Sequence, residues 1–101
     1  MEEKMNIQEI KRLIEKHFAD IKKTFSIKEI GLFGSYVKGE EKPESDVDIL
    51  VVFDGGHKDF FNYMRLKYYL EGIIGKKVDL VIKEAVKPRL QEKIFKEVVY
   101  V

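Results

Sequence analysis

The chain has 101 residues, 45% of them hydrophobic and 37% charged, which fits one globular domain over residues 1–101 with a highly charged exterior. Its 19 basic and 18 acidic residues leave a net charge of +1, so we expect no direct nucleic-acid binding through a broad basic surface. The absence of cysteine excludes disulfides and thiolate metal sites, and no apolar run reaches the length of a membrane span, so we expect a cytoplasmic protein with no membrane association.

The first half of the chain leads up to a glycine–serine turn. Apolar residues at helical spacing and periodic strand patterns predict a helix over residues 7–22, a strand over 26–33, a short helix over 35–38 and a polar loop over 40–45. Asn6 is the expected N-cap of the first helix. Gly34 ends the strand, and a glycine there lets the backbone approach a ligand closely.

The second half alternates strands and helices. The patterns predict a strand over residues 47–53, a helix over 58–74, a strand over 78–82 and a helix with Pro88 in its first turn. In the 58–74 helix we expect one wide apolar face to cover the sheet, formed by Phe60, Phe61, Met64, Leu66, Tyr68, Leu70 and Ile73, with Tyr63 and Tyr69 toward the outside. In the last helix the expected buried stripe is Leu90, Ile94, Phe95 and Val98, and residues 99–101 form either a short strand or a packed tail.

This order of elements predicts an α/β fold with a small central mixed sheet of three to four strands flanked by helices. We expect the first two strands to be antiparallel. The second and third strands are joined by a helix of crossover length, so we expect them to be parallel neighbours.

Two aspartates open the second predicted strand. Asp46 and Asp48 project to the same face, with Cα atoms about 6–7 Å apart, because strand side chains alternate. Two ionised carboxylates at that range repel by roughly 2–3 kcal/mol at an effective dielectric near 20. A strand that places oxygen ligands in this way favours a hard cation, Mg²⁺ or Mn²⁺. The alternative is that Asp46 caps a turn and Asp48 faces solvent.

The turn at Gly34-Ser35 strengthens the cation interpretation, since its backbone N–H groups and hydroxyl could hold a phosphate. A phosphate cradle beside paired carboxylates indicates phosphoryl or nucleotidyl transfer. Asp79 is the only charge in the apolar run 78–82, which makes it either an incidental edge carboxylate or a third metal ligand. The upstream pair and the parallel neighbour strand favour the ligand.

The block Gly34-Ser35, Gly39 and Ser45-Asp46-Val47-Asp48, followed by an apolar strand, resembles the nucleotidyltransferase superfamily with the DNA polymerase β-type core. The small size resembles the minimal nucleotidyltransferases, MNT antitoxins that pair with HEPN toxins. This resemblance implies that Asp46, Asp48 and Asp79 are catalytic and hold two Mg²⁺ ions, with Mn²⁺ as the substitute. It also implies that Gly34, Ser35 and Lys38 bind the nucleoside triphosphate. Family members often carry arginine where this chain has Tyr36 and Lys38, and lysine keeps the charge without the bidentate fork.

The resemblance further implies transfer of AMP from ATP to a tyrosine of a cognate HEPN RNase toxin, which neutralises the toxin in a hetero-oligomer. The chain has almost no room for an acceptor site of its own, which fits an acceptor presented by another protein. Three alternatives remain. One is an antitoxin or binding module that acts by complex formation without catalysis. The second is a small-molecule, antibiotic-type nucleotidyltransferase, and the third is a structural domain whose motif similarity is accidental.

Overall fold

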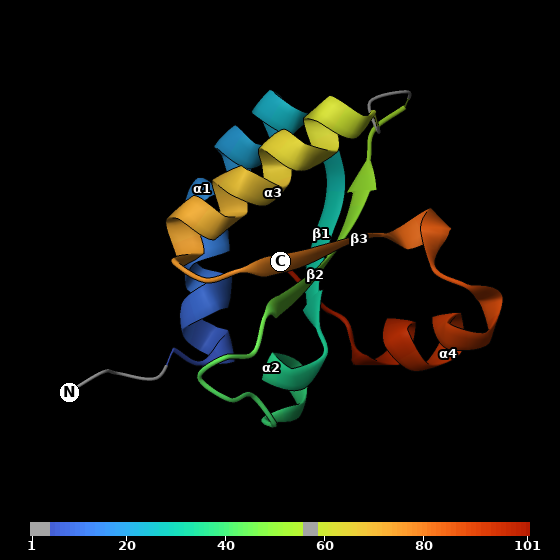
Figure 1. Cartoon of the computed structure of the whole chain (residues 1–101). Helices are drawn as coiled ribbons and strands as arrows, with labels where there is room; N and C mark the ends of the chain where they lie inside the picture. Colours follow the sequence, from blue (N-terminus) through green and yellow to red (C-terminus); the bar gives the residue numbers. More distant parts are fainter. Residues whose placement is uncertain (1–4, 56–58) are drawn as a thin grey trace.

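The computed structural model describes residues 5–55 and 59–101, which build a four-stranded mixed sheet with the strand order β3-β2-β1-β4 (Figure 1). The elements in chain order are α1 (Ile7–Phe25), β1 (Ile27–Phe33), α2 (Ser35–Lys38), β2 (Val47–Phe53), α3 (Phe60–Ile74), β3 (Val78–Ile82), the 3₁₀ helix η1 (Lys83–Ala85), α4 (Pro88–Glu97) and β4 (Val99–Tyr100). β1 is antiparallel to both β2 and β4, whereas β2 and β3 are parallel. The predicted α/β fold and strand directions are confirmed.

The helix boundaries follow local capping chemistry. The Asn6 side chain accepts a hydrogen bond of 2.9 Å from the Glu9 backbone N–H, which confirms the predicted N-cap. α1 continues three residues beyond the predicted end at residue 22 because Phe25 is buried in the core, and it ends at Ser26 in the left-handed conformation. Asp59 caps α3 in the same way as Asn6 caps α1. Residue 58, the predicted start of that helix, lies outside the described residues.

α1 and α3 lie side by side on one face of the sheet, and α4 lies on the other face (Figure 1). The larger core, between the sheet and the first pair of helices, includes Ile10, Ile14, Ile21, Leu32, Ile49, Val51, Leu66 and Leu70. The smaller core, beneath α4, is formed by Phe33, Leu50 and Val86, with Ile94, Phe95 and Val98 packed against them. Alternate residues of β1 and β2 therefore serve the two cores.

The predicted buried face of α3 is right at Leu66, Leu70 and Ile73 and wrong in where it places the aromatic residues. Phe60, Phe61 and Tyr68 are 62%, 81% and 60% exposed, whereas Tyr63 and Tyr69 pack against the larger core. The buried stripe is set by Leu66, Leu70 and Ile74, which recur every four residues along one side of the helix. Aromatic residues surround the helix on all sides, so their number alone does not identify the face that packs on the sheet.

The C-terminal elements close the second face. Leu90, predicted to be buried, is 41% exposed because the α4 side that packs on the sheet carries Ile94 and Phe95 instead. Of the two alternatives for the last residues, the short strand is confirmed, since β4 pairs with β1 at Gly31 and Leu32. Gly31 permits this approach, because a Cβ there would lie 2.5 Å from Val98 Cγ1.

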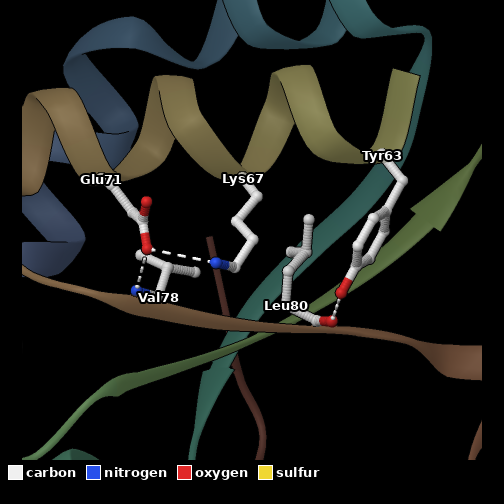
Figure 2. Close-up of polar contacts among 5 residues, drawn as sticks. All are labelled: Tyr63, Lys67, Glu71, Val78 and Leu80. Atoms are coloured by element: carbon white, nitrogen blue, oxygen red, sulfur yellow. Dashed lines mark hydrogen bonds and ion pairs between the residues drawn. The ribbon is translucent and has the colours of Figure 1, made fainter. Parts of the chain in front are cut away.

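Side chains of α3 cover the outer edge of β3 (Figure 2). The backbone carbonyl of Lys77 accepts a hydrogen bond from the Val47 N–H at the start of β2. Successive residues of a strand direct their backbone groups to opposite sides, so those of Val78 and Leu80 point away from β2, at the edge of the sheet. The Glu71 carboxylate accepts from the Val78 N–H at 2.9 Å, and the Tyr63 hydroxyl donates to the Leu80 carbonyl at 2.5 Å. One outward N–H and one outward carbonyl of this edge are therefore satisfied by side chains instead of another strand.

None of the helices within residues 5–55 and 59–101 has the length and apolar character needed to cross a membrane.

Candidate active site

Two of the three predicted catalytic carboxylates are direct neighbours in the sheet. Asp48 of β2 pairs in parallel register with Asp79 of β3, and on the other side it pairs with Phe33, the last residue of β1. Both aspartates alternate with residues of the larger core, so they lie on the face of the sheet that carries α4. The turn at Gly34 follows Phe33 directly and therefore reaches the same place.

Gly34 is in close contact with Asp48. A Cβ at residue 34 would lie 2.0 Å from Asp48 Oδ2, and the Gly34 φ of +78° belongs to a region that residues with side chains avoid. The position therefore requires glycine for two independent reasons. The predicted close approach of the backbone is present, and the group that approaches it is the carboxylate of Asp48.

The surroundings of Asp48 raise the pKa of its carboxyl from 3.8 to about 6. Burial is the largest cause, followed by the negative charge of Asp79, with a smaller contribution from Asp46 and from a hydrogen bond with the Asp79 side chain. The Ser35 backbone N–H bonds to the carboxylate and acts in the opposite direction. Uncompensated negative charge therefore accumulates where β1, β2 and β3 meet.

Asp46 is exposed and borders an open depression lined by Pro43, Glu44, Ser45, Asp46 and Gly75–Lys77. Two hydrogen bonds join the walls of this depression. The Val47 N–H donates to the Lys77 carbonyl at 2.9 Å, and the Lys76 side-chain Nζ donates to the Pro43 carbonyl at 3.4 Å. Two lysines on the turn before β3 thus lie beside the candidate site. Sequence reasoning did not identify them, because their only signal was a charged turn.

The three carboxylates lie near one another, but their oxygens do not converge on a single position. Asp48 and Asp79 are in contact, and Asp46 acts on Asp48 through its charge. Among the residues that the structure describes, no group of three His, Cys, Asp or Glu side chains is gathered tightly enough to hold a metal ion without adjustment. Asp46 and Asp79 are exposed, whereas Asp48 is partly buried.

The structure gives Lys38 a partner that the sequence did not reveal. Lys38 Nζ lies 3.3 Å from Glu97 Oε1, so the end of α2 is tied to the end of α4. Gly34 accepts hydrogen bonds from the N–H groups of Val37 and Lys38, which form the single turn of α2. Ser35, at the start of that turn, remains partly exposed beside Asp48.

Tyr36, at a position where family members often carry arginine, points away from the candidate site. Its side chain is 3% exposed and belongs to the larger core. It anchors the short helix α2 and takes no part in the polar cluster, so any cationic contact from this turn falls to Lys38.

The comparisons with known proteins agree with this geometry. A family profile described as nucleotidyltransferase domain matches residues 14–101. A Thermococcus cleftensis protein named protein adenylyltransferase MntA is 40% identical over 97 residues, which cover 96% of this chain and 97% of the relative. A solved structure described as a minimal nucleotidyltransferase matches with a TM-score of 0.76 at 30% identity. The match covers 97% of this chain and 98% of the solved chain.

A more distant structure shares the fold. It is that of a tri-AMPylated Shewanella oneidensis HEPN toxin in complex with MNT antitoxin, with a TM-score of 0.62 at 22% identity over 88% of this chain and 69% of the matched chain. The sequence resemblance is thus confirmed by the profile, the 40% identical relative and the shared fold. The chain belongs to the nucleotidyltransferase family of enzymes, among its minimal, MntA-like members.

Proposed function

We propose that this nucleotidyltransferase is an antitoxin that uses Mg²⁺ to transfer AMP from ATP to a tyrosine of a cognate HEPN RNase toxin, and so neutralises it. The observation that carries the proposal is the contact between Asp48 and Asp79 beside the Gly34-Ser35 turn. The 40% identical relative is named a protein adenylyltransferase, which supports a protein as the acceptor. The distant fold relative is a complex of an AMPylated HEPN toxin with an MNT antitoxin, which suggests the kind of partner.

The carboxylates fit a divalent cation by their chemistry. The pKa of Asp48 is raised first by burial and then by the negative charges of Asp79 and Asp46, which a bound cation would offset. Three hard oxygen donors are the ligands that Mg²⁺ and Mn²⁺ prefer, so Asp46, Asp48 and Asp79 would hold the metal, with two ions as in other nucleotidyl-transfer sites. Bound there, the metal would neutralise the α-phosphate and lower the pKa of the attacking hydroxyl.

The residues of the chain have separate roles in this proposal. Ser35 and the turn at Gly34 bind the β- and γ-phosphates from the β1 side of the site. Asp79, on the β3 side, accepts the proton of the incoming hydroxyl. An in-line displacement needs the leaving pyrophosphate and the attacking oxygen on opposite sides of the phosphorus. With the phosphates on the β1 side, the acceptor in this proposal approaches from the β3 side, where the depression beside Asp46 lies.

Lys38 has a conditional role. Its ammonium group is paired with Glu97, so a triphosphate must either share this lysine with the carboxylate or displace the carboxylate. Half-exposed ion pairs of this kind contribute little free energy, so a polyanion with several charges can compete for the lysine. We propose Lys38 as a phosphate contact on this basis.

The experiment is an intact-mass measurement of a candidate HEPN-family partner protein. The partner is co-purified with wild-type chain or with the Asp46→Asn/Asp48→Asn variant, and then incubated with Mg²⁺ and ATP. Adducts of AMP mass on the partner that appear only with wild type support the proposal, and peptide mapping identifies the modified residue. Asp20→Asn, on the exposed surface of α1, is the matched control and should behave as wild type.

Two other outcomes point to other functions. A partner that binds both forms, gains no mass and is still neutralised would identify an antitoxin that acts by complex formation. The depression beside Asp46 favours the second candidate, a small-molecule nucleotidyltransferase, because it lies on the acceptor side of the site. Incorporation of label from α-³²P-ATP into free aminoglycosides, without a protein partner, would support that candidate and contradict the proposal.

A further inference from the structure

The outward face of α3 exposes large aromatic side chains that no other part of the described chain covers. Phe60, Phe61 and Tyr68 are more than half exposed, and the rings of the two phenylalanines stack on each other with centroids 5.9 Å apart. Aromatic residues are enriched in interfaces because they remove much apolar area from water at a low entropic cost. Three of them on one helix face indicate a surface that another molecule covers.

Gly72 lies on this same face. A Cβ at residue 72 would meet nothing within 4 Å, and the residue is exposed in the interior of a 15-residue helix. Glycine within a helix is less stable than alanine, and no packing within the described chain compensates for this loss. A glycine that no internal contact requires is explained if the backbone of another molecule or a large side chain approaches it from outside.

Phe61, Arg65, Tyr68 and Gly72 follow one another at spacings of four, three and four residues, which aligns them along one stripe of α3. The stripe is complementary to itself in reverse order. When a second copy lies antiparallel across it, with the two-fold axis between residues 66 and 67, Phe61 faces Gly72 of the other copy. Arg65 then faces Tyr68 of the other copy. Within the chain the Arg65 guanidinium carbon lies 5.8 Å from the Phe25 ring centroid and Lys67 Nζ lies 5.8 Å from that of Tyr68, so a cation–aromatic contact between the copies would share or replace these. Each large side chain meets a small or complementary one, as a two-fold interface requires.

We infer that the chain forms a symmetric homodimer in which α3 packs antiparallel on α3 of a second copy. The three exposed aromatic side chains offer on the order of 400 Å² per copy, so two copies would bury about 800 Å² through them. That contribution lies below the roughly 1,200 Å² at which stable interfaces begin, so the dimer should be weak and reversible, with dissociation in the micromolar range.

The position of α3 makes this dimer compatible with the candidate active site. α3 covers the face of the sheet opposite the one that carries Asp48 and Asp79. Dimerisation through α3 would therefore leave both sites open and directed away from each other. The inference does not depend on the proposed antitoxin function, because it concerns association of the chain with itself.

Sedimentation velocity over a concentration series tests the inference. The proteins compared are wild type, Phe61→Ala, Gly72→Phe and the double variant, in which the large and the small residue of the stripe exchange positions. Each single variant should raise the dimer dissociation constant at least about tenfold. The double variant should return to within about threefold of wild type, because Phe at residue 72 then faces Ala at residue 61 of the other copy. Leu90→Ala, an exposed apolar residue on α4, is the control and should dimerise as wild type does. All these positions are exposed, so the variants should fold.

Three results would overturn the inference. The first is a wild-type chain that remains monomeric at about 100 µM, far above the expected micromolar range. The second is tighter association of Gly72→Phe, which would mean that any added aromatic surface causes sticking. The third is a double variant whose dimer dissociation constant is as high as those of the single variants, which would exclude the antiparallel register.

Discussion

Replacing Asp48 by asparagine should stabilise the metal-free protein at neutral pH while removing a proposed metal ligand. The pKa of the Asp48 carboxyl is raised to about 6 in the folded chain, chiefly by burial and by the charge of Asp79. The folded state thus binds this proton more tightly than the unfolded state, where the pKa is near 3.8. The associated stability is fully present below pH 3.8 and is lost as the pH rises through 6.

At about 1.4 kcal/mol for each pKa unit, the loss at pH 7 is at most about 3 kcal/mol, and solvent screening of this half-buried carboxylate lowers it below that limit. Asparagine keeps an oxygen for the Ser35 N–H and has no charge to be repelled by Asp79. We therefore expect the free energy of unfolding of Asp48→Asn to exceed that of wild type by up to about 3 kcal/mol at pH 7. At pH 4 the advantage should shrink to about 0.5 kcal/mol, because wild-type Asp48 is then largely protonated in the folded state.

Urea unfolding in EDTA at both pH values measures these differences. Asp20→Asn is the control, and as an exposed substitution it should stay within about 0.5 kcal/mol of wild type. Added Mg²⁺ should narrow the gap at pH 7, since a cation at the carboxylates stabilises wild type more than the variant. The reasoning is refuted if Asp48→Asn is no more stable than wild type at pH 7, or if its advantage is the same at both pH values.

Two further substitutions test single contacts. Gly34→Ala places a methyl group against the Asp48 carboxylate at a backbone conformation that suits only glycine, so we expect the variant to be less stable by about 1–3 kcal/mol. Because the carboxylate is displaced, nucleotidyl transfer should fall about 100-fold. Unchanged activity in a label-transfer assay would contradict this. Tyr63→Phe removes the hydroxyl that donates to the Leu80 carbonyl and should lower the free energy of unfolding in urea by about 1 kcal/mol. Tyr68→Phe, at an exposed position, is the control and should not change it measurably. Equal changes in the two variants would show that the edge hydrogen bond contributes nothing.

Patterns local to the chain predicted most of the fold and the centre of the candidate site. The alternation of side chains in β2, together with a crossover helix before β3, was enough to bring Asp48 and Asp79 to one place, and the register of the sheet makes them direct neighbours. Gly34 was identified as a point of close approach from its position after a strand. These predictions rest on periodicity and connection rules, which act over short stretches of sequence.

The features that escaped prediction depend on contacts between distant residues or on the rotation of a helix. The pairing of Lys38 with Glu97 joins two helices that are far apart in sequence, and nothing in either segment indicates the other. The prediction for α3 placed Leu66 and Leu70 correctly but put several aromatic residues on the wrong side. Its apolar residues do not form a single stripe, so only packing against α1 and the sheet selects the buried side. The aromatic residues left outside, Phe61 among them, are those that suggest a partner.

The side-chain contacts of Tyr63 and Glu71 along β3 also limit how copies of this protein can associate. An open strand edge is a template onto which another chain can add by backbone hydrogen bonding, and this is a common route to irreversible aggregation. On β3 the Val78 N–H and the Leu80 carbonyl already have side-chain partners, so a foreign strand that pairs there would have to break two hydrogen bonds before forming its own. At this edge the protein can therefore be concentrated without extending its sheet, and contacts with other molecules depend on side-chain surfaces that can separate again.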